Sequence, residues 1–173
     1  MLLLFLIRPD YLVMWGFLLL IPFLLLTKRK TQLLNLLLAA VIGFSWMLIG
    51  GNQYGYNHSM LKLLGFNSFP LFAWPLGLFA VYLIVSRLGI KHPFNRILVY
   101  CLVFWSLLLS AETIAYHVLF IRNIATAAYA GLPICDCLHA PHWMQAAYLL
   151  MGPIFSLLSE ALRKIRLRLS LNL

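Results

Sequence analysis

The sequence predicts an all-α integral membrane protein whose 173 residues form a single polytopic bundle of five transmembrane helices. Hydrophobic residues make up 64% of the chain and charged residues only 10%, whereas about a quarter of a soluble domain is charged. A water-soluble fold of this size would leave much of that apolar surface exposed. In a bilayer, a helix crosses with about 20 mainly apolar residues. No segment shows the strict alternation of a membrane β-barrel strand.

Five apolar segments supply the crossings, and each has a recognisable start or end. The first follows "RPDY", where proline and aspartate favour a helix start, and closes at "TKRK". The second ends at a glycine pair. The third begins at "FPLF" and contains a further proline, which lipid-embedded helices tolerate. A loop rich in glycine and proline separates the fourth from the fifth. The expected spans are residues 11–27, 33–49, 69–85, 97–121 and 143–162.

The basic residues gather on one side of this bundle, which predicts its orientation. Successive loops alternate sides, and lysine and arginine favour the cytoplasm. The residues expected inside are Lys28, Arg29, Lys30, Arg87, Lys91, Arg96, Arg163, Lys164, Arg166 and Arg168, against Arg8, Lys62 and Arg122 outside. The N-terminus is therefore expected outside and the C-terminus in the cytoplasm, in a plasma membrane or a bacterial inner membrane. We expect the basic tail "RKIRLRLSLNL" to extend the last helix into the cytoplasm and to lie against anionic lipid, with binding to a soluble partner as the alternative.

The same distribution explains the net charge of +9. Basic clusters at the ends of apolar segments face anionic headgroups, and no extended polar surface is present to read a nucleic acid. Nucleic-acid binding is therefore excluded, and the lipid bilayer is the expected partner. The first residues, "MLLLFLI", lack the basic region and cleavage site of a secretory signal, so we expect them to be retained.

The two loops expected outside, residues 50–68 and 122–142, carry most of the polar side chains. In the second, the stretch "GLPICDCLHAPHW" places Cys135, Cys137, His139 and His142 close together, which favours a zinc or copper site, completed if needed by His58. A disulfide between the two cysteines is the second interpretation. A plain turn set by glycine and proline is the third. In the first loop, "NQYGYNH" indicates either a polar binding site or a loop that hydrogen-bonds to itself.

Glu112 is the acidic residue predicted deep within a transmembrane segment, where such groups usually mark function. Tyr116 follows four residues later on the same helical face and can hydrogen-bond to it, and His117 belongs to an adjacent polar stripe. A carboxyl in low-dielectric surroundings favours its protonated form. Glu112 is thus a candidate general acid, with Tyr116 and His117 as further catalytic candidates. The alternative is that Glu112 joins two helices through Asn35 or Ser45.

Three classes of function follow from these features. The first is a membrane-embedded enzyme that acts on a lipophilic, isoprenoid-like substrate, with Glu112 as proton donor and Trp46, Trp74 and Trp105 as candidate walls for a carbocation. The second is a redox or metal-handling protein that uses the outer Cys/His cluster. The third is a non-catalytic subunit of a larger membrane complex or a homo-oligomer. Nucleotide-binding loops and the common hydrolase and metalloprotease motifs are absent.

Overall fold

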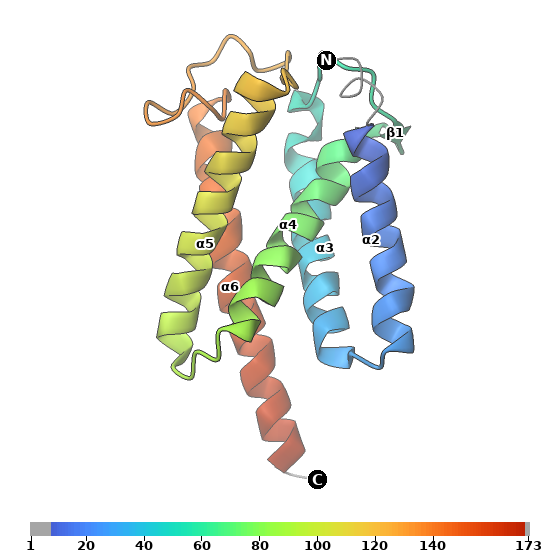
Figure 1. Ribbon diagram of the computed structural model, residues 1–173, viewed down its shortest axis with the longest axis vertical. Helices are drawn as coiled ribbons and strands as arrows, with labels where there is room; N and C mark the ends of the chain where they lie inside the picture. Colours follow the sequence, from blue (N-terminus) through green and yellow to red (C-terminus); the bar gives the residue numbers. More distant parts are fainter. Residues whose placement is uncertain (1–7, 172–173) are drawn as a thin grey trace.

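A computed structural model describes residues 8–171 of the chain (Figure 1). Its long helices run up and down through the molecule: α2 (Pro9–Leu26), α3 (Lys30–Gly50), α4 (Ser68–Arg87), α5 (Pro93–Thr113) and α6 (His142–Leu171). Each of these five is long and apolar enough to cross a membrane. The predicted helical class and the five predicted apolar helices are therefore confirmed. The apolar start of the chain, expected to be retained, lies outside the described residues.

Helix boundaries differ from the predicted spans where local capping decides them. α4 begins directly after Asn67, whose side-chain oxygen accepts a hydrogen bond from the Phe69 N–H at 3.1 Å, as an N-cap residue does. α6 continues past the predicted transmembrane span, which ends at residue 162, to Leu171, because no glycine or proline interrupts that stretch. The predicted extension of the last helix into the basic tail is therefore confirmed. Figure 1 shows this extension continuing straight beyond the rest of the bundle.

α4 is the central helix and contacts each of the other four. Its Leu78 and Phe79 are fully buried and join Phe155 of α6 in the core. The approach of α5 to α6 is especially close at Gly152, where an added Cβ would lie 2.3 Å from the Phe104 ring. Glycine at this position lets the two backbones pack closely, as small residues do between membrane helices.

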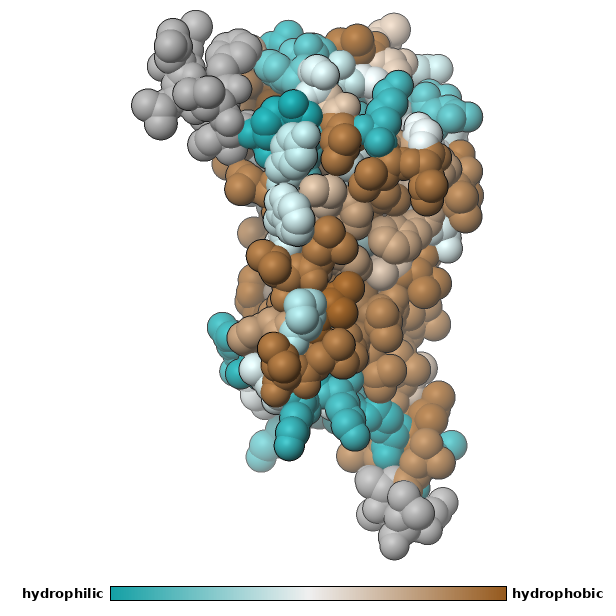
Figure 2. Space-filling view, turned by 90° about the vertical axis from the view of Figure 1, so that its right-hand side faces the viewer, coloured by the Kyte–Doolittle hydropathy of each residue, from teal (hydrophilic) through white to brown (hydrophobic). Residues whose placement is uncertain are grey.

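The two ends of the bundle differ in chemistry. One end, called here the loop end, holds the long connections 51–67 and 119–141. The other, called the basic end, holds the short connections 27–29 and 88–92 together with the extension of α6. A band of apolar side chains lies between polar side chains at the two ends (Figure 2). This arrangement is the one expected of helices that cross a bilayer.

Two asparagines hold the connections of the loop end together. The Asn57 side chain accepts from the Arg122 N–H at 2.9 Å and donates to the Phe120 carbonyl at 2.8 Å. The Asn123 side chain accepts from the Gly55 N–H at 2.9 Å and donates to the carbonyl of residue 53 at 2.7 Å. The loop "NQYGYNH" is therefore anchored mainly to the other loop and not to itself. A short hairpin, β1 (Lys62–Leu63) and β2 (Phe66–Asn67), then leads into α4.

Candidate functional site

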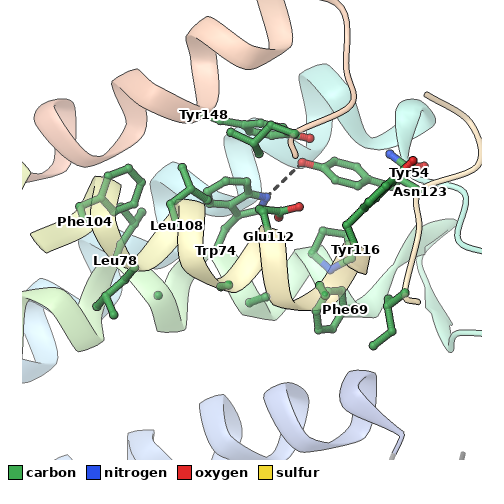
Figure 3. A pocket seen from close by; sticks show the side chains of 18 of the residues that line it. Tyr54, Phe69, Trp74, Leu78, Phe104, Leu108, Glu112, Tyr116, Asn123 and Tyr148 are labelled. Atoms are coloured by element: carbon green, nitrogen blue, oxygen red, sulfur yellow. Dashed lines mark hydrogen bonds between the residues drawn. The ribbon is translucent and has the colours of Figure 1, made fainter. Parts of the chain in front are cut away.

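A cavity of about 300 Å³ lies between α4, α5 and α6 and extends to the loop end (Figure 3). Its wall is mainly apolar and aromatic. Trp74 of α4, Phe104 of α5 and Tyr148 of α6 line it, and Tyr54 and Tyr56 from the loop after α3 complete the wall. Cavities of ~300–1,000 Å³ with a few convergent polar groups are the usual form of a small-molecule site. We refer to it as the Glu112 cavity.

Glu112 supplies the one carboxyl group among the described residues that line the cavity, and none of these residues is a lysine or arginine. It projects from α5 toward the aromatic side chains (Figure 3). The ion pairs in the described part of the chain involve Asp10, Asp136 and Glu160, and none involves Glu112. An apolar environment without a counter-ion favours a neutral carboxyl. A neutral carboxyl is a proton donor.

The helix that carries Glu112, α5, widens shortly after this residue. It passes at Ile114 into a π-helical turn, η2 (Ile114–Val118), and such turns occur frequently at functional sites. Tyr116, within the turn, lines the same cavity as Glu112. The expected hydrogen bond between the two side chains is not formed. The Tyr116 ring instead stacks on His139, with centroids 4.3 Å apart and planes inclined by 18°, because the widened turn directs Tyr116 toward the loop before α6.

Tyr54 holds the aromatic wall in a defined arrangement. Its hydroxyl oxygen accepts hydrogen bonds from Trp46 Nε1 at 2.6 Å and from Trp74 Nε1 at 3.1 Å. Burial raises the pKa of Tyr54, which keeps the phenol neutral. One hydroxyl thus fixes the Trp74 ring in the wall and the Trp46 ring behind it.

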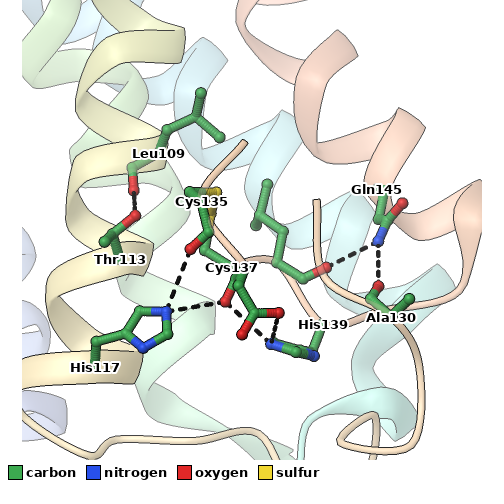
Figure 4. Close-up of a disulfide and its surroundings, with 10 residues drawn as sticks. Leu109, Thr113, His117, Ala130, Cys135, Cys137, His139 and Gln145 are labelled. Carbon is green, nitrogen blue, oxygen red and sulfur yellow. Dashed lines mark hydrogen bonds and ion pairs between the residues drawn. A yellow bond between two sulfur atoms is a disulfide. The ribbon is translucent and has the colours of Figure 1, made fainter. Parts of the chain in front are cut away.

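The loop before α6 contains a disulfide between Cys135 and Cys137 (Figure 4). Cys137 is fully buried, and its carbonyl accepts a hydrogen bond from the Leu132 N–H at 2.7 Å. Glycine is required at position 131, since an added Cβ would lie 2.9 Å from the backbone of Asp136 and from the carbonyl oxygen of Cys137. Of the interpretations derived from the sequence, the disulfide is the one that the structure contains.

Two histidines hold this disulfide loop against the bundle. His139 Nδ1 lies 2.9 Å from the Tyr129 carbonyl, and His139 Nε2 lies 3.1 Å from the Asp136 carbonyl. His117 Nε2 lies 3.0 Å from the same Asp136 carbonyl. His139 also lines the Glu112 cavity, whereas His117 is not among its lining residues. His117 therefore lies against the disulfide loop and outside the cavity. Its position does not support the catalytic role predicted for it.

The predicted zinc or copper site gains no support. Cys135 and Cys137 are joined to each other, whereas metal ligation requires thiolates. His142 Nδ1 lies 3.3 Å from Oε1 of Gln145, within hydrogen-bonding reach. Among the residues that the structure describes, no three or more His, Cys, Asp or Glu side chains are grouped so that they could hold a metal ion. His139 therefore belongs to no such group.

The three tryptophans proposed as walls have different positions. Trp74 lines the cavity. Trp46 lies behind the wall, where it supports Tyr54. Trp105 is not among the lining residues and donates a hydrogen bond from Nε1 to the Leu149 carbonyl at 2.9 Å. Tyr148 of α6 is also part of the wall.

The predicted link between Glu112 and Asn35 or Ser45 of α3 is not found in the structure. Asn35 of α3 accepts a hydrogen bond from the Ser159 hydroxyl of α6 at 2.6 Å. Asn35 is buried toward the basic end, and neither it nor Ser45 lines the Glu112 cavity. The carboxyl therefore remains directed into an open space and not into a neighbouring helix.

The fold and site define a helical protein with five apolar helices and an acidic, aromatic cavity between them. Comparisons of the chain with known protein families, with curated proteins and with solved structures find no match.

Proposed function

We propose that the protein is a multi-pass membrane enzyme that protonates a carbon–carbon double bond of a lipophilic, isoprenoid-like substrate. The observation that carries this proposal is the position of Glu112, a carboxyl without a basic partner that faces an aromatic cavity between apolar helices. A neutral carboxyl can act as a general acid. Aromatic faces attract the positive charge that follows protonation.

The proposed reaction begins when the Glu112 hydroxyl gives its proton to one carbon of the double bond. The π electron pair of the alkene forms the new C–H bond, and the neighbouring carbon becomes a cation. The rings of Trp74 and Tyr148 face the space in which this charge forms. The Glu112 carboxylate then takes a proton from an adjacent carbon, which restores the acid and completes either an isomerisation or, after attack by a second double bond, a cyclisation.

Tyr54 acts in this scheme as a positioning residue. Its hydroxyl receives the indole hydrogen bonds that fix Trp46 and Trp74. A fixed aromatic face attracts a developing positive charge through the quadrupole of its ring, and it does not need to reorganise during the reaction. Trp46 does not line the cavity, so it acts only by holding the Tyr54 side chain in place.

Deuterium incorporation tests the proposal for any isoprenoid substrate. Membranes isolated from cells that produce the wild type or Glu112→Gln are incubated in deuterated water, and their isoprenoid lipids are compared by mass spectrometry. We expect a deuterated product in the wild type that is lost in Glu112→Gln, since the amide keeps the shape but has no acidic proton. Ser110→Ala, an exposed change on the same helix, is expected to retain the product. Identical lipid profiles for wild type and Glu112→Gln would overturn the proposal.

The orientation proposed with this function places the loop end outside and the basic end in the cytoplasm. The basic residues support it, and the disulfide at the loop end supports it independently, because disulfides persist in oxidising compartments. Single cysteines at Lys62 and Lys91, in a background without the native cysteines, test it with a membrane-impermeant thiol reagent. We expect labelling from outside at position 62 and protection at position 91, and the reverse pattern would contradict the orientation.

A further inference from the structure

The Glu112 cavity reaches the molecular surface along the seam between α4 and α5. Small residues line most of this edge: Ala73, Gly77 and Ala80 of α4, and Ala111 and Ala115 of α5. The exposed Leu107 of α5 lies beside them. Gly77, Ala80 and Ala111 are themselves exposed. A Cβ added at Gly77 would meet no atom within 4 Å. The cavity is therefore open sideways, through a part of the surface that no side chain fills.

This opening lies on the apolar flank of the bundle. Both of its edges belong to helices that are long and apolar enough to cross a membrane, Ser68–Arg87 and Pro93–Val118. The buried residues of α5 end at Phe104. Beyond Phe104, the cavity takes the place of a packed core between α5 and α4. In a bilayer, such an opening faces the hydrocarbon chains of the lipids.

The size of the cavity limits what it can enclose. At the ~30 Å³ that a water-sized group occupies in a liquid, a volume of about 300 Å³ holds about ten such groups, the carbon skeleton of about two isoprene units. A longer prenyl chain would have to leave part of its length outside. Because the opening is apolar, the remainder of the chain can stay in lipid while its end lies beside Glu112.

We infer that the seam between α4 and α5 is a lateral access route by which the end of a long prenyl chain enters the Glu112 cavity from the bilayer. This inference rests on the proposed function for the identity of the substrate, but it concerns binding and not proton transfer. Gly77 and Ala111, on facing helices, are the positions at which a larger side chain closes the route. The occupant is a membrane-dissolved isoprenoid, and a helix from a second protein seated in the seam is the competing outcome.

Photolabelling in proteoliposomes tests the route. The probe is geranylgeraniol with a diazirine at the end of the chain remote from the hydroxyl, and labelled peptides are identified by mass spectrometry. In the wild type we expect labels on the cavity wall, in the peptides that contain Tyr116 or Tyr148. Gly77→Leu is expected to reduce labelling about tenfold, because the leucine side chain occupies the opening. Ser106→Leu places the same side chain at an exposed position of α5 outside the cavity and is expected to label as the wild type does.

Further variants separate the possible outcomes. Ala111→Leu closes the seam from the other helix, so the test does not depend on whether Gly77→Leu folds. Wild-type labelling in both variants, labels outside the cavity, no labelling of the wild type, or a protein partner that occupies the seam would overturn the inference. Glu112→Gln is expected to label normally. If it labels normally and keeps its turnover, the proposed function fails while the access route stands. If turnover requires Glu112 but neither seam variant alters labelling, the access route alone fails.

Discussion

Removing one hydroxyl, in Tyr54→Phe, should measurably destabilise the bundle. The Tyr54 oxygen accepts hydrogen bonds from the indoles of Trp46 and Trp74 at 2.6 and 3.1 Å, and phenylalanine keeps the ring but leaves both donors without this acceptor. Side-chain hydrogen bonds between membrane helices contribute on average ~0.6 and at most ~1.7 kcal/mol each. Two lost bonds therefore lower the free energy of unfolding by about 1 to 3 kcal/mol, which is about 5-fold to 150-fold in the unfolding equilibrium.

The measurement is an equilibrium unfolding titration with sodium dodecyl sulfate in mixed micelles, followed by tryptophan fluorescence. Tyr56→Phe is the matched control. Tyr56 lines the same cavity, and no hydrogen bond of its hydroxyl is found among the described residues, so its loss should change stability by less than about 0.5 kcal/mol. The reasoning would be refuted by a Tyr54→Phe variant as stable as the wild type, or by an equal loss in both variants.

Three further predictions concern packing, charge and redox state. Gly152→Ala should lower stability by about 1 to 3 kcal/mol because its Cβ meets the Phe104 ring, and an unchanged denaturation midpoint would contradict the close approach of α5 to α6. Glu160→Gln should cost about 3 kcal/mol, since Glu160 accepts from Arg96 Nη2 at 3.0 Å with both side chains mostly buried; stability equal to that of the wild type would refute this contribution. Thiol titration of the denatured, unreduced protein should detect only Cys101 among the three cysteines of the chain, and all three after reduction. Three reactive thiols before reduction would exclude the disulfide.

The helices are predictable because the features that specify them are local. Apolar length and the flanking proline, glycine and basic residues locate each span to within a few residues, as for α4, expected from residue 69 and found from Ser68. The transmembrane span predicted for α6 ends at residue 162, and the helix continues into the basic tail as expected, because that tail marks the limit of the apolar segment and not of the helix. Charge marks where a helix leaves lipid, but it does not end a helix in which every residue can remain helical.

The assembly of the site is less predictable because it depends on contacts between distant segments. Glu112 can be found from the sequence, since a carboxyl in an apolar segment stands out. Its neighbour Tyr148 lies 36 residues further along the chain, and nothing in the local pattern relates the two. The π-helical turn at Ile114–Val118 likewise has no sequence signal in an apolar helix. Regular helical spacing correctly predicts that Tyr116 lies near Glu112, since both line the cavity. It also predicts a hydrogen bond between their side chains, which is not formed because the π-helical turn changes the direction of Tyr116.

The carboxyl of Glu112 and the Cys/His cluster of the loop before α6 lie next to each other in the fold. Leu138 and His139, which directly follow the disulfide, line the same cavity as Glu112. His117, five residues after Glu112 on the same continuous segment, contacts the carbonyls of Cys135 and Asp136. A change in the disulfide loop is therefore transmitted to the wall beside the acid through at most two contacts. Loss of activity in a Cys135→Ser variant would consequently not establish redox chemistry. Redox chemistry would require activity that follows the thiol–disulfide state while binding to the cavity stays constant.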